Sequence, residues 1–374
     1  MGGVLNKRNL LINIGLMLGG TAIGIIAVLL ILNSGEIQLG GTRFIFTDYN
    51  GDNFAHQQGL VRPPATNRIL EDVVIFRDAD GFRRPALTAD SYPIIAIGDS
   101  FTDGGQTPWV DYLAQSLNTP VRNLGWRGFG PLEYVAVMRD YGGDDHQWIL
   151  IAFFEGNDLG NIATSHTALK TREMLTSNAT AVPPDAPPEA FGIPQRDWYL
   201  YPLTHANFGD IAYLSSSLWW LNGTHETYQQ SQNMRLLGDA LSQIQAMAGD
   251  ACLGFIYIPS KEHLYFSYAD PMGNRQYVLQ NGGRLVLDEA GWLSISDEAV
   301  DYTVWDANKD NLHDVIADMI ADMDGWTFID LLPTFENRAS MGILTYYEYD
   351  SHWNDAGHQL AGETIADVVR RGCE

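Results

Sequence analysis

Short apolar runs alternate with helix-like stretches along the chain from residue 91 onward. The apolar runs are Ile94–Ile97, Val121–Leu124, Trp148–Phe154, Leu253–Ile258 and Trp326–Leu331. The helix-like stretches are Trp109–Leu117, Leu132–Tyr141, about Glu226–Met247 and about Ala356–Arg370. Apolar strands that alternate with helices are typical of a parallel sheet covered by helices. We therefore predict an α/β domain over residues 91–374.

Two regions interrupt this alternation. Residues 160–223 carry the proline pairs Pro183-Pro184 and Pro187-Pro188 among small polar residues, and we interpret them as an insertion over the site. Between the last two apolar runs the chain is polar and rich in Asp and Asn, and no strand is assigned there. Residues 33–90 are mixed in character and are expected to form a stalk and a leading segment packed on the domain.

The N-terminal region predicts a membrane anchor. Residues 10–32 contain no charged side chain, and as a helix they would extend roughly 34 Å, enough to cross a bilayer. Lys7 and Arg8 precede this stretch and the next basic residue is Arg43, which places residues 1–9 in the cytoplasm and the domain outside it. A cleaved signal peptide is the alternative, but no small-x-small cleavage pattern follows the apolar stretch. Either interpretation exports the domain to the periplasm or cell surface.

Composition and charge narrow the class of protein. The chain has 374 residues and 45% hydrophobic content, enough for a substantial core. Its formal net charge of −24 makes nucleic acid an unfavourable partner. The two cysteines, Cys252 and Cys373, lack the spacing of a metal site, and the sequence leaves open whether they form a disulfide or stay as free thiols.

Candidate chemistry begins where the first strand ends. The run Ile94–Ile97 continues into Gly98-Asp99-Ser100, so Ser100 would stand at the carboxyl end of a buried strand, as a nucleophile does. After the last strand, Asp350 precedes His352 by two residues. Loops that follow parallel strands open on the same edge, so His352 could act as general base on Ser100 while Asp350 orients the imidazole.

Two further loops offer donors for an oxyanion. Gly128 follows the second strand and Asn157 follows the third, in the segments Asn123 to Gly128 and Glu155-Gly156-Asn157-Asp158. A glycine allows a backbone N–H to approach a ligand closely, and an asparagine amide can donate to developing charge. With the backbone N–H of Ser100 they would form an oxyanion hole. Neighbouring residues of the same segments are the expected substrate-pocket residues, namely Asp99, Glu155, Asp158 and Trp353.

The order of these four segments resembles the SGNH/GDSL hydrolase superfamily over roughly residues 91–372. The serine, glycine, asparagine and histidine of that family match Ser100, Gly128, Asn157 and His352. The resemblance implies a flavodoxin-like three-layer α/β/α sandwich with a parallel sheet, and ester chemistry through an acyl-enzyme without a metal or cofactor. Many members place the acid three residues before the histidine, where this chain has Tyr349, so Asp350 and Glu348 both remain candidates for the acid.

Part of the sequence is also similar to the alginate O-acetyltransferase branch, in Asp350-Ser351-His352-Trp353 and in Pro259-Ser260-Lys261-Glu262. The expected function is an anchored extracytoplasmic esterase that removes an acyl group, in particular acetyl, from a carbohydrate or polysaccharide. The first alternative is a polysaccharide O-acetyltransferase that works beside a membrane acyltransferase partner. The second is a catalytically silent polysaccharide-binding or assembly protein.

Overall fold

The computed structural model describes residues 36–39, 42–45, 78, 80–143, 145–166, 200–205, 207–269, 279, 283–348 and 350–373. The predicted anchor at residues 10–32 and most of the predicted stalk lie outside these ranges. Within them, no helix has both the length and the apolar character that a membrane span requires. Near the N-terminus the described residues include an antiparallel pair, β1 (Glu36–Leu39) with β2 (Thr42–Ile45).

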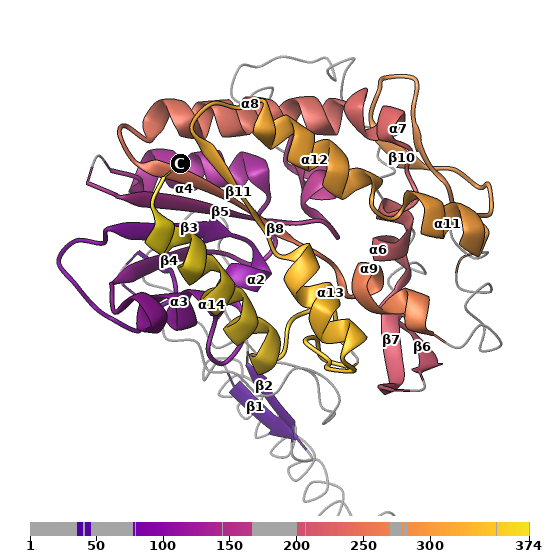
Figure 1. Ribbon diagram of the computed structural model, residues 1–374, viewed down its shortest axis with the longest axis horizontal. Coiled ribbons are helices and arrows are strands. Elements are labelled where there is room, and N and C mark those ends of the chain that lie inside the picture. Colours follow the sequence, from indigo (N-terminus) through magenta and orange to yellow (C-terminus); the bar gives the residue numbers. More distant parts are fainter. Residues whose placement is uncertain are drawn as a thin grey trace, which may run out of the picture.

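A five-stranded parallel sheet forms the centre of the domain (Figure 1). Its strands are β3 (Ile94–Gly98), β4 (Val121–Gly125), β5 (Trp148–Phe154), β8 (Cys252–Ile258) and β11 (Trp326–Asp330). They lie in the order β11-β8-β5-β3-β4, so the first sheet strand in the chain lies between the second and the third. This order is flavodoxin-like, and its switch point lies between β3 and β5, where ligands bind beyond the carboxyl ends of the strands.

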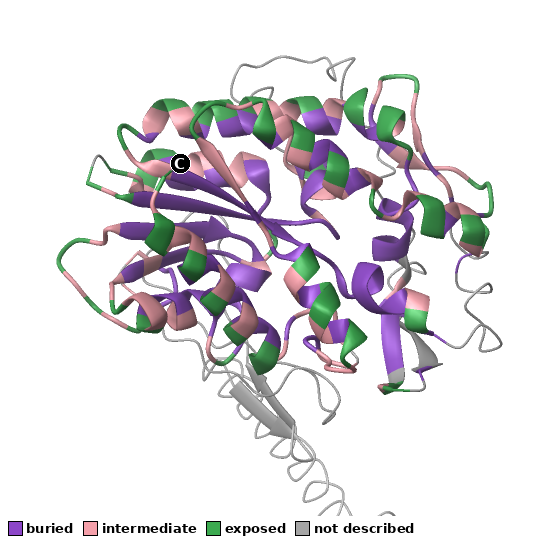
Figure 2. Ribbon diagram, in the orientation of Figure 1, coloured by how far each residue is buried: buried purple, intermediate pink, exposed green. Residues whose placement is uncertain are grey.

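Helices cover both faces of the sheet, because alternate residues of each strand point to opposite sides. Ile94 and Ala96 of β3 belong to one hydrophobic core, and Ile95 and Ile97 belong to the other. The first core is closed by α3 (Trp109–Leu117), α13 (Leu332–Ser340) and α14 (Asp355–Arg371). The second is closed by α4 (Pro131–Tyr141), α8 (Gln232–Met247) and α12 (Asn311–Ala321). Figure 2 shows the buried strands between partly exposed helices, which is the predicted three-layer sandwich.

Several elements lie where the sequence pattern assigned none. The polar region before β11 contains the strands β9 (Leu285–Leu287) and β10 (Leu293–Ile295), and then α11 (Tyr302–Asn308) and α12. The helix α12 buries a stripe at Leu312, Val315, Ile316 and Ile320, although acidic residues dominate its sequence surroundings. The helix predicted near 226–247 is two helices, α7 (His225–Gln229) and α8, because the side chain of Ser231 caps a new start.

The predicted insertion contains a helical segment at 158–166, then the hairpin of β6 (Leu200–His205) and β7 (Gly209–Leu214), and then α6 (Ser215–Trp220). Beyond β8, the chain forms the short helix α9 (Lys261–Tyr265) and a 3-10 turn, Phe266–Tyr268. The backbone N–H of Ala212 in β7 donates to the carbonyl of Glu348 at 2.8 Å. The insertion is therefore bonded to the segment that carries Asp350 and His352.

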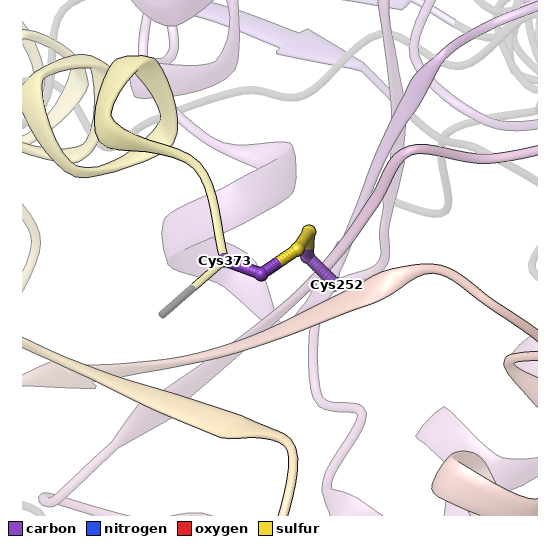
Figure 3. Close-up of a disulfide and its surroundings, with 2 residues drawn as sticks. All are labelled: Cys252 and Cys373. Carbon is purple, nitrogen blue, oxygen red and sulfur yellow. A yellow bond between two sulfur atoms is a disulfide. The ribbon is translucent and has the colours of Figure 1, made fainter.

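The two cysteines form a disulfide, which the sequence alone left open (Figure 3). Cys252 is the first residue of β8 and Cys373 follows α14, and their Cα atoms are 5.6 Å apart. The bond joins the end of the last helix to the amino-terminal edge of the sheet, opposite the edge where Ser100 lies. Because α14 begins directly after the segment with His352, this bond holds the far end of the helix that supports the candidate site.

Candidate active site

Ser100 stands at the switch point of the sheet. The strand β3 ends at Gly98, and Ser100 is the first residue of the short helix α2 (Ser100–Asp103). The carboxylate of Asp99 caps this helix by accepting a hydrogen bond from the N–H of Phe101 at 2.9 Å. A side chain at Gly98 would have its Cβ 2.2 Å from the hydroxyl oxygen of Thr102, so the tight turn into α2 requires glycine there.

The structure brings Ser100, His352 and Asp350 into one hydrogen-bonded chain. Nε2 of His352 is 2.8 Å from Oγ of Ser100, across 252 positions of sequence. Nδ1 of the same ring is 2.5 Å from Oδ1 of Asp350, which also accepts from the backbone N–H of His352 at 2.8 Å. One ring nitrogen thus faces a carboxylate and the other faces a hydroxyl, as proton transfer from the serine requires.

The acid that contacts His352 is Asp350. Burial by itself would raise the pKa of this carboxyl, but the adjacent His352 charge and hydrogen bonds outweigh it and lower the pKa to about 2. Asp350 therefore stays ionised through the neutral range. The alternative acid is Glu348. Its backbone carbonyl accepts a hydrogen bond from the N–H of Ala212. The two-residue spacing works because the bridge between Tyr346 and Trp353 closes the segment into a narrow loop.

A cavity of about 260 Å³ opens beside the serine and histidine. Its walls come from the loop after β5, the helical segment 158–166, the end of β7 and α6. The lining residues are Ser100, Phe154, Gly156, Asn157, Gly160, Asn161, Thr164, Leu214, Ser216, Ser217, Trp220, Ser351 and His352. Apart from His352, no ionisable side chain is among these described residues. Hydroxyls, amides and one indole ring therefore dominate the surface that a substrate would meet.

Of the expected oxyanion donors, Asn157 lines the cavity and Gly128 does not. Asn157 lines the cavity together with Ser100 and His352, as an amide donor must. Gly128 lies in the loop after β4, next to β3 in the sheet, and has a φ of +79° that favours glycine. It is not among the described residues that line the cavity, so its backbone N–H remains a predicted donor. The side-chain amide of Asn123 binds the carbonyl of Thr102 at 2.6 Å and so supports the end of α2.

The four expected pocket residues lie behind the cavity wall, which corrects that prediction. Asp99, Glu155, Asp158 and Trp353 are fully buried, and none lines the cavity. Trp353 instead packs its ring against Phe335 and Phe101, at centroid distances of 5.1 and 5.0 Å. The sequence pattern could not make this distinction, because neighbouring residues of one loop point alternately toward the cavity and toward the core.

Asp99 and Asp158 form an interacting pair of buried carboxyls beneath the serine. Burial raises the pKa of Asp99 to about 6, although the N–H of Phe101 and nearby positive charges partly oppose this. Burial and the charge of Asp99 raise the pKa of Asp158 well above its usual value. Asp158 accepts from the N–H of Phe154 at 3.1 Å and from the hydroxyl of Tyr134 at 3.0 Å. Asp158 thereby joins the loop after β5 to α4, while Asp99 caps α2.

Glu155 belongs to a second histidine cluster. Its carboxylate lies 3.0 Å from Nδ1 of His263, whose Nε2 lies 2.8 Å from Oδ1 of Asp310. It also accepts from the N–H of Ser260 at 2.5 Å and from the hydroxyl of Tyr257. Burial alone would lower the pKa of His263, but the charge of Glu155 and the hydrogen bonds to both carboxylates raise it to about 9. This cluster joins the ends of β5 and β8 behind the cavity.

No protein-family model and no curated protein matches the chain. Solved structures do match at low identity. An extracellular lipase from Streptomyces rimosus is 16% identical, with 75% of this chain and 99% of that chain covered and a TM-score of 0.38. A GDSL-family lipolytic protein from Veillonella parvula is 13% identical over 75% and 100% of the two chains, with a TM-score of 0.33.

A family two carbohydrate esterase from Clostridium thermocellum, solved in complex with cellohexaose, is 11% identical over 76% and 66% of the two chains, with a TM-score of 0.32. The likeness to the alginate O-acetyltransferase branch stays a prediction. The assignment of roles below rests on the geometry of the site itself.

Sequence reasoning missed the residues that shape the cavity from the insertion. Ser216, Ser217 and Trp220 lie on α6, which directly follows the hairpin β6-β7, and they line the cavity. The ring of Trp220 is so close to Gly160 that a Cβ there would lie 3.0 Å from it. A run of aromatic residues in an insertion was the only signal, and such a run is equally compatible with core packing.

Proposed function

We propose that the protein is a serine esterase of the SGNH type that removes small acyl groups from uncharged carbohydrate esters. The observation that carries the proposal is the chain of hydrogen bonds from Ser100 through His352 to Asp350 at the mouth of a cavity. Acyl transfer needs a nucleophile, a base within hydrogen-bond distance and a group that orients the base, and these three residues meet that requirement.

The reaction would proceed in two balanced halves. His352 takes the proton of Ser100 at Nε2 while Oγ attacks the ester carbon, and the negative charge on the carbonyl oxygen is stabilised by the N–H groups of Ser100, Gly128 and Asn157. The imidazolium then gives its proton to the departing sugar oxygen, which leaves an acyl group on Ser100. Water attacks this acyl-enzyme and gives a proton to Nε2 of His352, and the imidazolium returns that proton to Oγ of Ser100 as the bond to the acyl group breaks and the carboxylic acid departs.

The lining of the cavity supports the substrate class. A volume of about 260 Å³ accommodates a short acyl chain beside part of a sugar ring, but not a long fatty chain. The hydroxyls of Thr164, Ser216 and Ser217 can bond to sugar hydroxyls, and Trp220 offers a ring face. No Lys or Arg lines the described cavity to bind a uronate, and the net charge of −24 repels polyanionic glycans.

The test uses the purified full-length chain with p-nitrophenyl acetate, butyrate and octanoate. We expect turnover of acetate that falls steeply with chain length, labelling by a fluorophosphonate, and loss of both in Ser100→Ala. Acetylated neutral oligosaccharide should be deacetylated faster than acetylated polyuronate. Absence of turnover together with absence of labelling would leave the binding-protein alternative, and acetylated glycan formed from an acceptor would favour the transferase.

We also propose that the domain is extracytoplasmic and anchored by residues 10–32. The disulfide between Cys252 and Cys373 supports this location, because structural disulfides persist in oxidising compartments. In intact expressing cells, an external protease should remove the domain and leave an N-terminal membrane fragment. Recovery of the whole chain with free thiols in the cytosol would contradict the proposed location.

A further inference from the structure

Lys261 is a fully buried cation. Its ammonium contacts neither the His352 ring nor the cluster of Glu155, His263 and Asp310. Lys261 is the first residue of α9, just after β8. Its Nζ donates to three backbone carbonyls, those of Tyr347 at 3.3 Å, Glu348 at 3.4 Å and Asp350 at 2.8 Å. An ammonium group has three N–H donors, so each of them has a carbonyl partner.

All three carbonyls belong to the loop that carries Asp350 and His352. The loop is closed at its ends by the bridge between Tyr346 and Trp353, and by the N–H of Tyr347 that donates to the carbonyl of His352 at 3.0 Å. Between these ends, all three carbonyls accept from the same atom, Nζ of Lys261. Lys261 thus binds the backbone of Asp350, whose carboxylate contacts His352.

The next residue, Glu262, connects the start of α9 to the cavity wall. Its buried carboxylate accepts from the N–H of Leu214 at 2.7 Å, and Leu214 lines the cavity. The charged and titratable groups that face Lys261 are Glu262 on α9, Asp350 on the loop and Tyr213 on β7, whose ring centroid is 6.0 Å from Nζ. The start of α9 therefore joins the insertion, the cavity wall and the loop of His352.

We propose that Lys261 is a positioning residue for the reaction, which holds the loop so that Asp350 and His352 align with Ser100. This inference rests on the proposed function, since it assigns to Lys261 an effect on the same reaction. A buried ammonium opposes folding unless it is well paired, and an apolar residue of similar length would avoid that cost. The charge of Lys261 also favours the ionised form of Asp350, although burial and His352 act on that carboxyl more strongly.

A pH dependence separates this role from simple packing. Burial lowers the pKa of Lys261 to about 8, with Glu262 and Asp350 partly opposing the shift. Above that pH the neutral amine keeps two N–H donors for three carbonyls, so the loop loses one contact. Tyr213 does not titrate in this range, because burial raises its pKa well above the usual value.

The experiment compares Lys261→Met with Lys309→Met in the full-length chain. Lys309 pairs with Asp310 at 2.9 Å outside the catalytic loop, so its variant removes the same group elsewhere. With p-nitrophenyl acetate, K261M should lose about 10- to 100-fold in kcat at nearly unchanged KM, because a displaced base costs rate but not binding. K309M should keep wild-type values.

The wild-type kcat should also fall above pH 8, and K261M should lack this alkaline limb. If K261M does not fold, Lys261→Gln and the wild-type pH profile carry the test. A kcat of either folded variant within twofold of wild type, or a wild-type profile that stays flat to pH 9.5, would overturn the positioning role. Failure of the proposed function would be seen separately, as a wild-type protein that neither turns over substrate nor accepts the fluorophosphonate.

Discussion

Two imidazole rings at the carboxyl edge of the same sheet have opposite surroundings. His352 has a carboxylate on Nδ1 and a serine hydroxyl on Nε2, and 24% of its side chain is exposed beside the cavity. His263 has carboxylates on both nitrogens and no exposed side-chain surface. A ring with two anionic acceptors holds both protons at neutral pH, where the pKa of His263 is raised to about 9, so it is not a base under those conditions. The comparison teaches that the partner of the second nitrogen decides whether a histidine can exchange a proton.

The largest contrast is expected when each ring is removed. His352→Ala should reduce kcat by about 10⁴- to 10⁶-fold with a small change in the melting temperature, because the base is lost while its ring, partly exposed, packs on the core through Phe101 at a centroid distance of 5.2 Å. His263→Gln should lower the melting temperature and leave kcat of the folded fraction within about tenfold, because its partners Glu155 and Asp310 touch no reacting atom. Ester turnover and thermal unfolding of both variants check this, and equal losses of kcat would break the comparison.

The carboxylate on His352 should have the next largest effect. Asp350→Asn is expected to reduce kcat by about 10²- to 10⁴-fold, because the amide can favour the wrong tautomer and cannot stabilise the imidazolium. Glu348→Gln should remain within about threefold, since Oδ1 of Asp350 is the acceptor found at Nδ1. Steady-state kinetics on both variants decide between the two acids, and a larger loss in E348Q would reverse the assignment.

Glu155 and Asn157 are two residues apart and sharpen the comparison further. Asn157→Ala should cost about 10²- to 10³-fold in kcat, the usual effect of removing one oxyanion donor. Glu155→Gln should act mainly on stability, since the Glu155 carboxylate binds His263, Ser260 and Tyr257 within the core. Parallel measurements of kcat and of the midpoint of urea unfolding test this division, and a stable but equally inactive E155Q would contradict it.

The smallest effect concerns pH and stability. The pKa of His263 rises from its ordinary 6.5 to about 9 on folding, so its contribution to stability is complete below pH 6.5 and is lost as the pH rises to 9. The free energy of unfolding should fall by on the order of 3 kcal/mol across this window. Urea unfolding at pH 6 and pH 9 measures the fall, and H263Q is the control because it lacks the titrating ring. A fall of the same size in H263Q would exclude His263 as its source.

Local pattern was sufficient for the elements that build the sheet. The runs at Ile94–Ile97, Trp148–Phe154 and Leu253–Ile258 became β3, β5 and β8 because strands buried on both faces must be apolar throughout. The pattern failed for α12 and for the hairpin β9-β10. The strands β9 and β10 are three residues each, too short to show a period of two. The stripe Leu312, Val315, Ile316 and Ile320 of α12 does have helical spacing, but it lies among acidic residues that obscured it.

The sequence by itself determined the parallel α/β architecture and pointed to a serine and a histidine in loops after strands, because strand periodicity and the edge at which loops emerge are local consequences of the chain. Only the tertiary structure decided between Asp350 and Glu348, joined Cys252 to Cys373 and assigned Glu155 to a buried ion cluster. It also brought Lys261 to the catalytic loop. These outcomes depend on which side chains far apart in sequence share a buried volume, and burial is a property of the whole packed molecule.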